Sequence, residues 1–509
     1  MSTGGDQAGL ARAIQAQTDQ EGSDQEGSVV NKFGYKQDLK RSLHFFALFG
    51  VSFSIISITT GIFLSFGVAM SYFGPASIWE WLVVGAGQLL VALVVAELGT
   101  RIPLAGYAYQ WSARLVSSSY GWFVGFFGLL YMTVGGGAIF LLVGTPLLLS
   151  EFGIDHPSGH LILSVTIIIM MVPLLLNVIS VQLASKVNSA AVVTEIIGTV
   201  VFGVLLMVLW GAKSKPSPYG WGILANTTAT THNALWYSVV LAAILGAYTL
   251  VGFELAADLA EEALDARKNV PKAVLIAVGA SVALGFVALV GFSVAIPSIK
   301  AIESTNLPLL AIANYWLPGW VVKLFIAFVI FSIFSISVVG TAAQARLVYS
   351  MARDNMLPFS AAFKKVHQRT QTPIIALLIF GAINVAFTIF GYTQKNSFDT
   401  LVGATAIIPF IIYFMITVAY AYKRKALESI PGAFNLGRYA KPVITAVLLW
   451  TLAMILALSL PSSFRLADAI VVGSTLLSLA WYLLVLKKRI SRGDAGVRPI
   501  EEYPLAGSQ

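Results

Sequence analysis

Long apolar stretches alternate with short polar segments along most of the chain. Twelve of these stretches are long enough for a helix to cross the hydrocarbon core of a bilayer, which takes about 20 residues. The alternating ten-residue pattern of a membrane β-barrel is absent from the sequence. The pattern therefore predicts an all-α polytopic membrane protein. The expected spans are 45–73, 78–99, 119–150, 161–180, 190–211, 237–260, 273–297, 320–349, 373–391, 399–422, 442–460 and 467–487.

The two ends of the chain lack this apolar character. The first 42 residues are polar and contain no apolar segment, so they are not a cleaved signal peptide. We expect residues 1–42 to be a disordered cytoplasmic tail, residues 43–490 to form the membrane domain and residues 491–509 to be a cytoplasmic C-terminal tail.

Composition narrows the function classes. Apolar residues make up 57% of the 509 residues and charged residues only 11%, against about 25% in soluble domains. This excludes a soluble enzyme, a nucleic-acid binder and a disordered scaffold. The chain has no cysteine, and its five histidines show no metal-ligand spacing, so neither a metal site nor a cofactor is expected.

The distribution of basic residues indicates the orientation in the membrane. With twelve spans both termini lie on one side, and the segments on that side carry 26 of the 32 Lys and Arg residues. Basic loops stay in the cytoplasm, so we expect both termini there, in the plasma membrane or the cell inner membrane. Orientation accounts for the net charge of +8, and no nucleic-acid partner is expected.

Two spans contain breaks in their apolar pattern. Residues 54–62 (SIISITTGI) and 246–254 (GAYTLVGFE) combine small and hydroxyl side chains with glycine in the first and sixth spans. Such clusters also serve helix packing in membranes. Because the two spans are separated by an odd offset, repeats starting at them would have opposite orientations, as in secondary transporters with discontinuous helices.

An unwound turn suits a zwitterionic ligand. Amide groups at the start of a half-helix attract a carboxylate, and the free carbonyls accept hydrogen bonds from an ammonium group. We expect the amides of residues 60–62 to bind the carboxylate, and carbonyls near Ile56, Ser57 and Tyr248 to bind the amine. The expected substrate-binding residues are Ile56, Ser57, Thr59, Thr60, Gly61, Ile62, Tyr248, Thr249, Gly252 and Phe253.

Several motifs together resemble the amino acid–polyamine–organocation (APC) superfamily. They are residues 96–111 (AELGTRIPLAGYAYQW), 252–254 (GFE), 261–262 (EE), 268–273 (KNVPKA), 345–358 (ARLVYSMARDNMLP) and 372–373 (TP). Residues 34–41 (GYKQDLKR), 54–61 (SIISITTG) and 434–439 (FNLGRY) resemble its amino acid/choline transporter branch, which includes γ-aminobutyrate permeases.

The resemblance implies a five-plus-five inverted repeat with two added helices. It places the substrate between the broken helices 1 and 6, against helices 3 and 8, with the aromatic ring of Phe253 as a lid. Related permeases carry a lysine in span 5 that fills a cation-site position and can move a proton. Glu195 stands at that place here, so the sign of the charge is reversed.

Glu195 is the strongest candidate for ion coupling. An unpaired charge in a membrane helix is costly, about 2.5–3.5 kcal/mol, so this carboxyl group faces the interior, pairs or takes up a proton. It could carry a proton, hold Na⁺ with the hydroxyl groups of Ser332, Ser335 and Ser337, or be a packing residue bonded to a neighbouring Ser or Thr.

Other charged residues near the span ends are candidates for gating. Glu97 and Arg101 form either a local pair one turn apart or a gate with Arg346, Arg353 or Asp354. Glu254 follows the second break, where it could cap the half-helix or sense the substrate amine.

These features predict a secondary active transporter that imports an amino acid or a small amine such as γ-aminobutyrate by alternating access. Co-transport of H⁺ is expected, with Na⁺ as the alternative. The other interpretations are a choline or ethanolamine carrier, an obligate amino-acid exchanger, and a nutrient sensor that does not transport. No enzymatic activity is expected, and nothing in the sequence indicates an oligomeric state.

Overall fold

The computed structural model describes residues 30–502, apart from residues 40, 155, 217, 230–233, 304, 306, 369, 371, 395–396 and 461. The described residues form helices and connecting segments, with a single isolated bridge between Leu43 and Ala263 in place of a sheet. The expectation of an all-α membrane protein is confirmed.

Eleven helical stretches of the described chain are long and apolar enough to span a membrane. The first runs over 57 residues, Phe45–Arg101, and contains two of the predicted spans. At 1.5 Å per residue it would be about 86 Å long if straight, far more than the ~30 Å hydrocarbon core. It turns at η1 (Gly74–Ile78), where Gly74 has φ +65° and Pro75 is the second residue of the 3₁₀ turn.

Each predicted span corresponds to a helix or a chain of helices. They are α2 (Phe45–Ile56) with α3 (Ile58–Phe73), α4 (Trp79–Arg101), α6 (Ser118–Ile139) with η2 (Phe140–Gly144) and α7 (Thr145–Glu151), α8 (Gly159–Ile179), α9 (Val181–Ile196) with η3 (Ile197–Val201) and α10 (Phe202–Gly211), α11 (Leu235–Ala242) with α12 (Ile244–Thr249) and η5 (Phe253–Glu262), α13 (Ala266–Val294), α16 (Gly319–Arg353), α18 (Ile374–Thr393), α19 (Ser397–Glu428), α20 (Ala440–Ser459), and α21 (Arg465–Trp481) with η8 (Tyr482–Leu486) and α22 (Lys487–Ser491).

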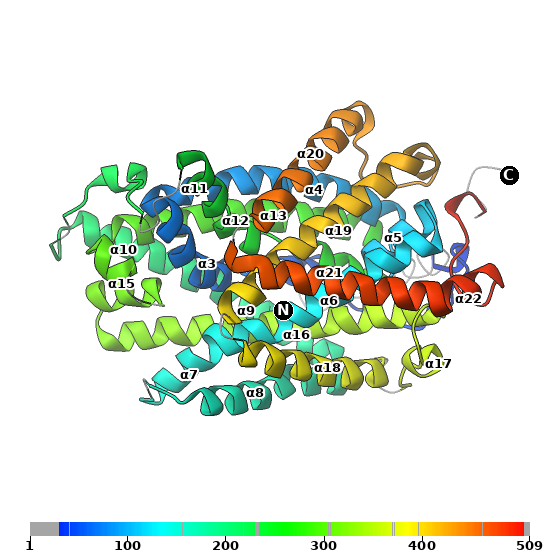
Figure 1. Ribbon diagram of the computed structural model, residues 1–509, viewed down its shortest axis with the longest axis horizontal. Coiled ribbons are helices and arrows are strands. Elements are labelled where there is room, and N and C mark those ends of the chain that lie inside the picture. The colour runs from blue at the N-terminus through cyan, green and yellow to red at the C-terminus, as the bar shows by residue number, and fades with distance from the viewer. Residues whose placement is uncertain are drawn as a thin grey trace, which may run out of the picture.

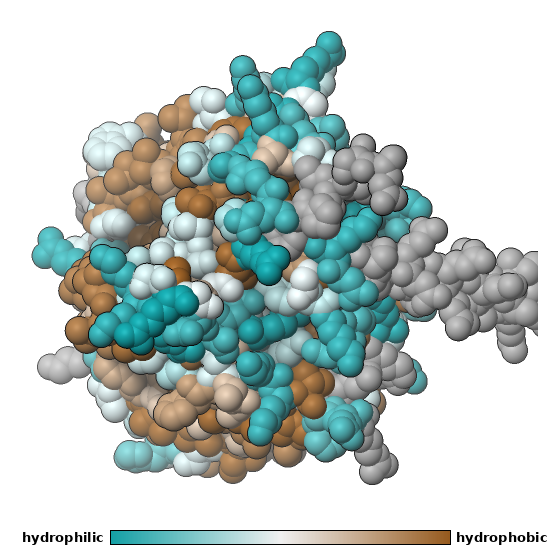
Figure 2. All heavy atoms as spheres, turned by 90° about the vertical axis from the view of Figure 1, so that its right-hand side faces the viewer, coloured by the Kyte–Doolittle hydropathy of each residue, from teal (hydrophilic) through white to brown (hydrophobic). Residues whose placement is uncertain are grey.

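Most of these helices run along the long axis of the molecule (Figure 1). The short helices α5 (Tyr107–Leu115) and α17 (Ser360–Phe363) lie with α22 at the right-hand end of this view, which we call the basic end. Hydrophilic residues cross the middle of this end, and hydrophobic ones lie at its margin (Figure 2). This distribution fits an end that faces water and sides that face lipid.

The outer helices expose apolar side chains along their length. Ile168 and Leu175 on α8, Leu449 on α20 and Leu476 and Leu477 on α21 are exposed. A water-soluble protein rarely shows apolar patches of this extent. The pattern is that of a helix bundle whose surface is covered by lipid.

Part of each predicted tail packs against the basic end. Phe33 and Leu39 are buried, and the Tyr35 hydroxyl lies 2.6 Å from Asp354 Oδ1. From the C-terminal segment, Ile500 is buried and the Gly496 amide donates to the Asp354 carbonyl at 2.9 Å. Residues 1–29 and 503–509, which complete the predicted tails, lie outside the described residues.

Candidate functional site

The first span is broken at one residue. Ser57 has φ 36° and ψ 82°, which ends α2 and starts α3. Its amide still donates to the Phe53 carbonyl and its carbonyl accepts from the Gly61 amide at 2.9 Å. The helix therefore changes direction at Ser57 without a long unwound segment.

The break in the sixth span is longer. α12 ends at Thr249, Leu250 leaves the helical region, and Gly252 has φ +83° before η5 begins. The Gly252 amide donates to the hydroxyl of Tyr413 on α19 at 3.0 Å. A positive φ favours glycine, which explains why the break falls at this residue.

The two breaks lie against each other. A Cβ added at Gly61 would be 2.3 Å from the Thr249 side chain, and one added at Gly252 would be 2.2 Å from Ile55 Cγ2. Glycine at both positions lets the halves of the first and sixth spans approach closely. The predicted juxtaposition of the broken helices is thus present in the fold.

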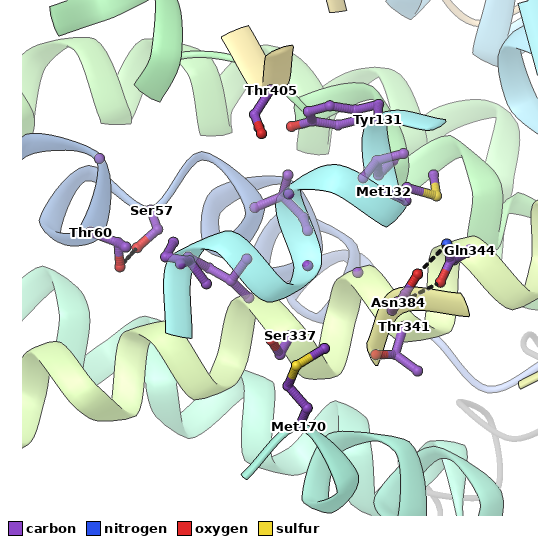
Figure 3. Close-up of a pocket in the computed structure, with 18 of the residues that line it drawn as sticks. Ser57, Thr60, Tyr131, Met132, Met170, Ser337, Thr341, Gln344, Asn384 and Thr405 are labelled. Atoms are coloured by element: carbon purple, nitrogen blue, oxygen red, sulfur yellow. Dashed lines mark hydrogen bonds between the residues drawn. The ribbon is translucent and has the colours of Figure 1, made fainter. Parts of the chain in front are cut away.

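A cavity of about 110 Å³ lies beside the breaks. This is several times the ~10–15 Å³ that one water needs on the same measure. It is lined by residues of α2, α3, α6, α8, α12, η5, α16, α18 and α19 (Figure 3). Its polar lining consists of Ser57, Thr60, Tyr131, Tyr248, Thr249, Ser337, Thr341, Gln344, Asn384 and Thr405.

Six of the ten predicted substrate-binding residues line this cavity: Ile56, Ser57, Thr60, Gly61, Tyr248 and Thr249. The other four are Thr59, Ile62, Gly252 and Phe253, which the described lining does not include. The side chain of Thr59 contacts Thr199, and Ile62 packs in the interior among apolar side chains.

Two details of the predicted ligand contacts need correction. Phe253 is fully buried and stacks on Tyr413 with ring centres 5.5 Å apart, and it does not belong to the described lining of the cavity. The Gly61 amide donates to the Ser57 carbonyl, so this amide is not open to a carboxylate, whereas the carbonyl oxygen can accept a second hydrogen bond.

Glu195 reaches the first break from the end of α9. Its Oε1 lies 2.8 Å from Ser57 Oγ and accepts from the Thr59 amide at 3.3 Å. The residue is 1% exposed, and its Oε2 has no hydrogen-bond partner among the described residues. Since Ser57 lines the cavity, one hydroxyl group connects Glu195 to the space where a ligand would bind.

A π-helical segment follows Glu195 directly. Thr199, in η3, contacts the Thr59 hydroxyl on α3. π-helical turns are rare and frequently occur at functional sites. Span 5 is thereby tied to the first break through both Glu195 and Thr199.

Among the described residues, no hydrogen bond joins Glu195 to Ser332, Ser335 or Ser337 of span 8. Ser335 Oγ donates to Asn188 Oδ1 at 2.7 Å, and Ser332 Oγ is buried without a hydrogen-bond partner among the described residues. Ser337 lines the cavity. The hydrogen bonds of Glu195 are made to Ser57 and Thr59 of the first break.

Glu254 stands in the first turn of η5, as the capping interpretation expects. Its Oε2 accepts from the Tyr413 hydroxyl at 2.6 Å, and it does not belong to the described lining of the cavity. Tyr413 therefore bonds both Gly252 and Glu254 and fixes the second break to α19.

Glu97 and Arg101 form the local pair, at 2.9 Å, and are both buried. Arg101 Nη1 donates to the carbonyls of Leu427, Glu428 and Ile430, and Glu97 Oε2 accepts from the Leu436 amide. These contacts tie α4 to the end of α19 and the segment that follows it, and among the described contacts none joins this pair to Arg346, Arg353 or Asp354.

Arg346 instead joins the sixth and eighth spans. It is fully buried and contacts Glu262 of η5 at 2.7 Å. Nearby, Arg353 contacts Glu261 at 2.8 Å, and Glu261 also accepts from the Ala105 amide. Two ion pairs thus fasten η5 to α16 on the side of the cavity that faces the basic end.

Asp354 completes this closure. Its carboxyl group accepts hydrogen bonds from Tyr35 at 2.6 Å, Tyr109 at 2.8 Å and Gln110 at 2.9 Å. Burial raises the pKa of Asp354, whereas the charge of Arg353 and the hydrogen bonds from the tyrosines lower it. The N-terminal segment therefore belongs to the closed side of the molecule.

Sequence reasoning missed part of the cavity wall. Tyr131, Gln344, Asn384 and Thr405 contribute to it from α6, α16, α18 and α19. The available signal was the position of Gln344 and Asn384 inside otherwise apolar spans, where polar side chains face the bundle interior.

Many membrane-spanning helices, two broken helices packed against each other and a central cavity beside the breaks are together typical of secondary transporters. The sequence matches the amino acid permease family over residues 43–484. The chain therefore belongs to this family, within the APC superfamily, and is a transporter and not an enzyme.

Relatives match over most of their length. The chain is 25% identical to the amino-acid permease BAT1 of Arabidopsis thaliana, covering 86% of this chain and 88% of the relative. It is 25% identical to a putative amino acid/polyamine transporter of Macrophomina phaseolina (77% and 89%). It is 24% identical to a putative polyamine transporter of Candida albicans (82% and 78%).

Proposed function

We propose that the protein imports an amino acid together with a proton by alternating access. The observation that carries this proposal is the contact between Glu195 and Ser57. A carboxyl group that is buried at the first break touches a hydroxyl group that lines the cavity. Protonation of Glu195 would change the hydrogen bonding of Ser57, and with it the shape of the ligand site.

The cavity supports an amino acid over a cationic amine. Among the described residues that line it, none is Asp, Glu, Lys or Arg. A polyamine or choline-like cation would have no carboxylate partner there, and an unpaired buried charge is costly. A zwitterion has no net charge and can bind through neutral polar groups beside the two breaks, such as the hydroxyl groups of Ser57, Thr60 and Thr249 that line the cavity. γ-Aminobutyrate is the first ligand to test because of the branch that the sequence resembles.

Two ion pairs would form the inner gate. Arg346–Glu262 and Arg353–Glu261 hold η5 against α16 in this structure, which suits a state closed toward the basic end. We place the basic end in the cytoplasm of a plasma or inner membrane, because basic segments remain there. Opening to the cytoplasm would then require both pairs to separate.

Uptake into proteoliposomes tests the proposal. Labelled γ-aminobutyrate is supplied with an inward proton gradient, with a sodium gradient, and with neither. We expect the proton gradient to drive uptake in the native protein, and Glu195→Gln to abolish that dependence while exchange of internal for external substrate continues. Glu80→Gln is the matched control, since Glu80 is also a buried acid but lies in α4, outside the described cavity lining.

Gradient-driven uptake that persists in Glu195→Gln would contradict proton transfer through this residue. Uptake driven only by the sodium gradient would support Na⁺ coupling instead.

A further inference from the structure

The cavity has two chemically different ends. In Figure 3, Ser57 and Thr60 of the first break lie at one end, and Gln344, Asn384 and Thr341 lie at the other. The first end offers the helix breaks. The second has no part in the proposed binding of the charged groups of an amino acid, so its polar side chains need a separate explanation.

Gln344 and Asn384 bond each other in both directions. Asn384 Nδ2 donates to Gln344 Oε1 at 2.8 Å, and Gln344 Nε2 donates to Asn384 Oδ1 at 3.2 Å. Gln344 Nε2 also donates to Thr133 Oγ1 at 3.0 Å. All three side chains are buried. The two amides are therefore held in fixed orientations by α6, α16 and α18.

This pair retains hydrogen-bonding capacity. An amide group has two N–H donors and an oxygen that accepts two hydrogen bonds. The described contacts use both donors of Gln344 but only one donor of Asn384, and they leave part of each oxygen's capacity unused. The hydroxyl group of Thr341, one turn before Gln344 on α16, also lines this end of the cavity.

We infer that Gln344 and Asn384 recognise the side chain of the substrate, and that they select a neutral side chain able to both donate and accept hydrogen bonds. This inference rests on the proposed function. With its charged groups at the breaks, an α-amino acid would extend its side chain toward the amide pair. Amides and hydroxyl groups match the free donor and acceptor, whereas a charged tip would be buried without a counter-charge.

Amino acids of similar length should then differ in affinity according to the chemistry of the side-chain tip. Glutamine offers a terminal amide, and methionine has a similar length without a hydrogen-bonding tip. Glutamate and lysine have similar lengths but carry a charge. γ-Aminobutyrate places its ammonium group at the far end from its carboxylate and is expected to bind less well than glutamine. Methionine would leave hydrogen-bonding groups of the Gln344–Asn384 pair without partners, and this disfavours its binding relative to glutamine.

Competition against uptake of labelled γ-aminobutyrate into proteoliposomes tests this inference. We expect glutamine to inhibit the native protein at concentrations at least about tenfold lower than methionine, with glutamate and lysine weaker than glutamine. In Asn384→Leu and in Gln344→Met the ratio between glutamine and methionine should fall to about one or reverse. Because each ratio is measured within one variant, reduced protein abundance does not alter it.

Asn177→Leu is the matched control. Asn177 is a buried asparagine of α8 that also bonds α16, through the Val338 carbonyl at 2.9 Å, but it lies outside the described cavity lining. Its substitution should leave the ratio unchanged. Equal inhibition by glutamine and methionine in the native protein, or a ratio unaffected by both cavity substitutions, would overturn the inference. If no amino acid inhibits uptake, the proposed function itself is wrong, and this inference with it.

Discussion

The two helix breaks perform the same geometric task by different means. At the first, one serine leaves the helix, and a carboxyl group from another span contacts its hydroxyl group. At the second, the chain turns at Gly252, which has a positive φ, and the Tyr413 hydroxyl group bonds both the Gly252 amide and the Glu254 carboxyl group. The second break is thus maintained by backbone geometry and by a phenol that is also bonded to the neighbouring Glu254, whereas at the first an ionisable group from another span contacts the break residue itself.

From this difference we infer that the second break acts as a fixed hinge and the first as a sensor of protonation. The bond at Gly252 itself joins a backbone amide to a phenol, and both groups keep their form over the physiological pH range; Glu254 contacts the phenol and not the break residue. The bond at Ser57 depends on whether the carboxyl group of Glu195 carries a proton. We therefore expect substitutions at the second break to change mainly stability, and those at the first to change mainly the dependence of transport on the proton gradient.

Gly252→Ala should have the largest effect on stability. The substitution forces a Cβ into a positive φ, 2.2 Å from Ile55 Cγ2 and 2.9 Å from the Tyr131 hydroxyl. The backbone strain and the clash together should cost roughly 2–5 kcal/mol, seen as a large drop in the unfolding temperature in detergent. Gly279→Ala is the control, because a Cβ at this helical glycine meets no atom within 4 Å. A small effect at Gly252 would show that this break is not fixed by glycine.

Tyr413→Phe should have an intermediate effect. It leaves the Gly252 amide without its acceptor and Glu254 Oε2 without its donor, while the stacking on Phe253 remains. Leaving buried groups unpaired costs about 1–3 kcal/mol. The unfolding temperature should fall, whereas the exposed Tyr422→Phe should not change it. If proton-driven uptake were lost at full stability, Tyr413 would belong with the sensor, and the comparison would fail.

Ser57→Gly and Ser57→Ala should show the smallest difference in stability of the three comparisons. Both remove the hydroxyl group that contacts Glu195, so both should weaken the proton dependence of uptake equally. Only glycine also relieves the strain of φ 36°, so Ser57→Gly should be more stable than Ser57→Ala by about 1 kcal/mol. Equal stability of the two variants, measured by thermal unfolding, would mean that this break stores no backbone strain.

The sequence was sufficient to locate the spans and both breaks, because apolar length and clusters of glycine and hydroxyl residues are local signals. Span 5 shows the limit of such signals. Its helix begins at Val181 and not near residue 190, because tertiary contacts accommodate polar residues such as Asn188, which bonds Ser335.

The orientation of side chains around the breaks was not predictable in the same way. Phe253 is adjacent to the break in sequence, yet it stacks on Tyr413 and does not belong to the described lining of the cavity. Gln344 and Asn384 lie 40 positions apart on two successive spans, and only the packing of α16 on α18 brings them together. Arg101 makes the local pair with Glu97 that sequence proximity predicts, but its further partners, carbonyl groups at the end of α19 and just after it, depend on the tertiary fold.

The convergence of both terminal segments on Asp354 has a consequence for biosynthesis. Tyr35 precedes all the membrane spans described here and Gly496 follows them, yet both bond this one residue. The contacts around Asp354 can be completed only when every span has been inserted. A nascent or truncated chain would therefore lack the finished closure at this end, and a leak through incomplete molecules is the hazard that late assembly of this cluster creates.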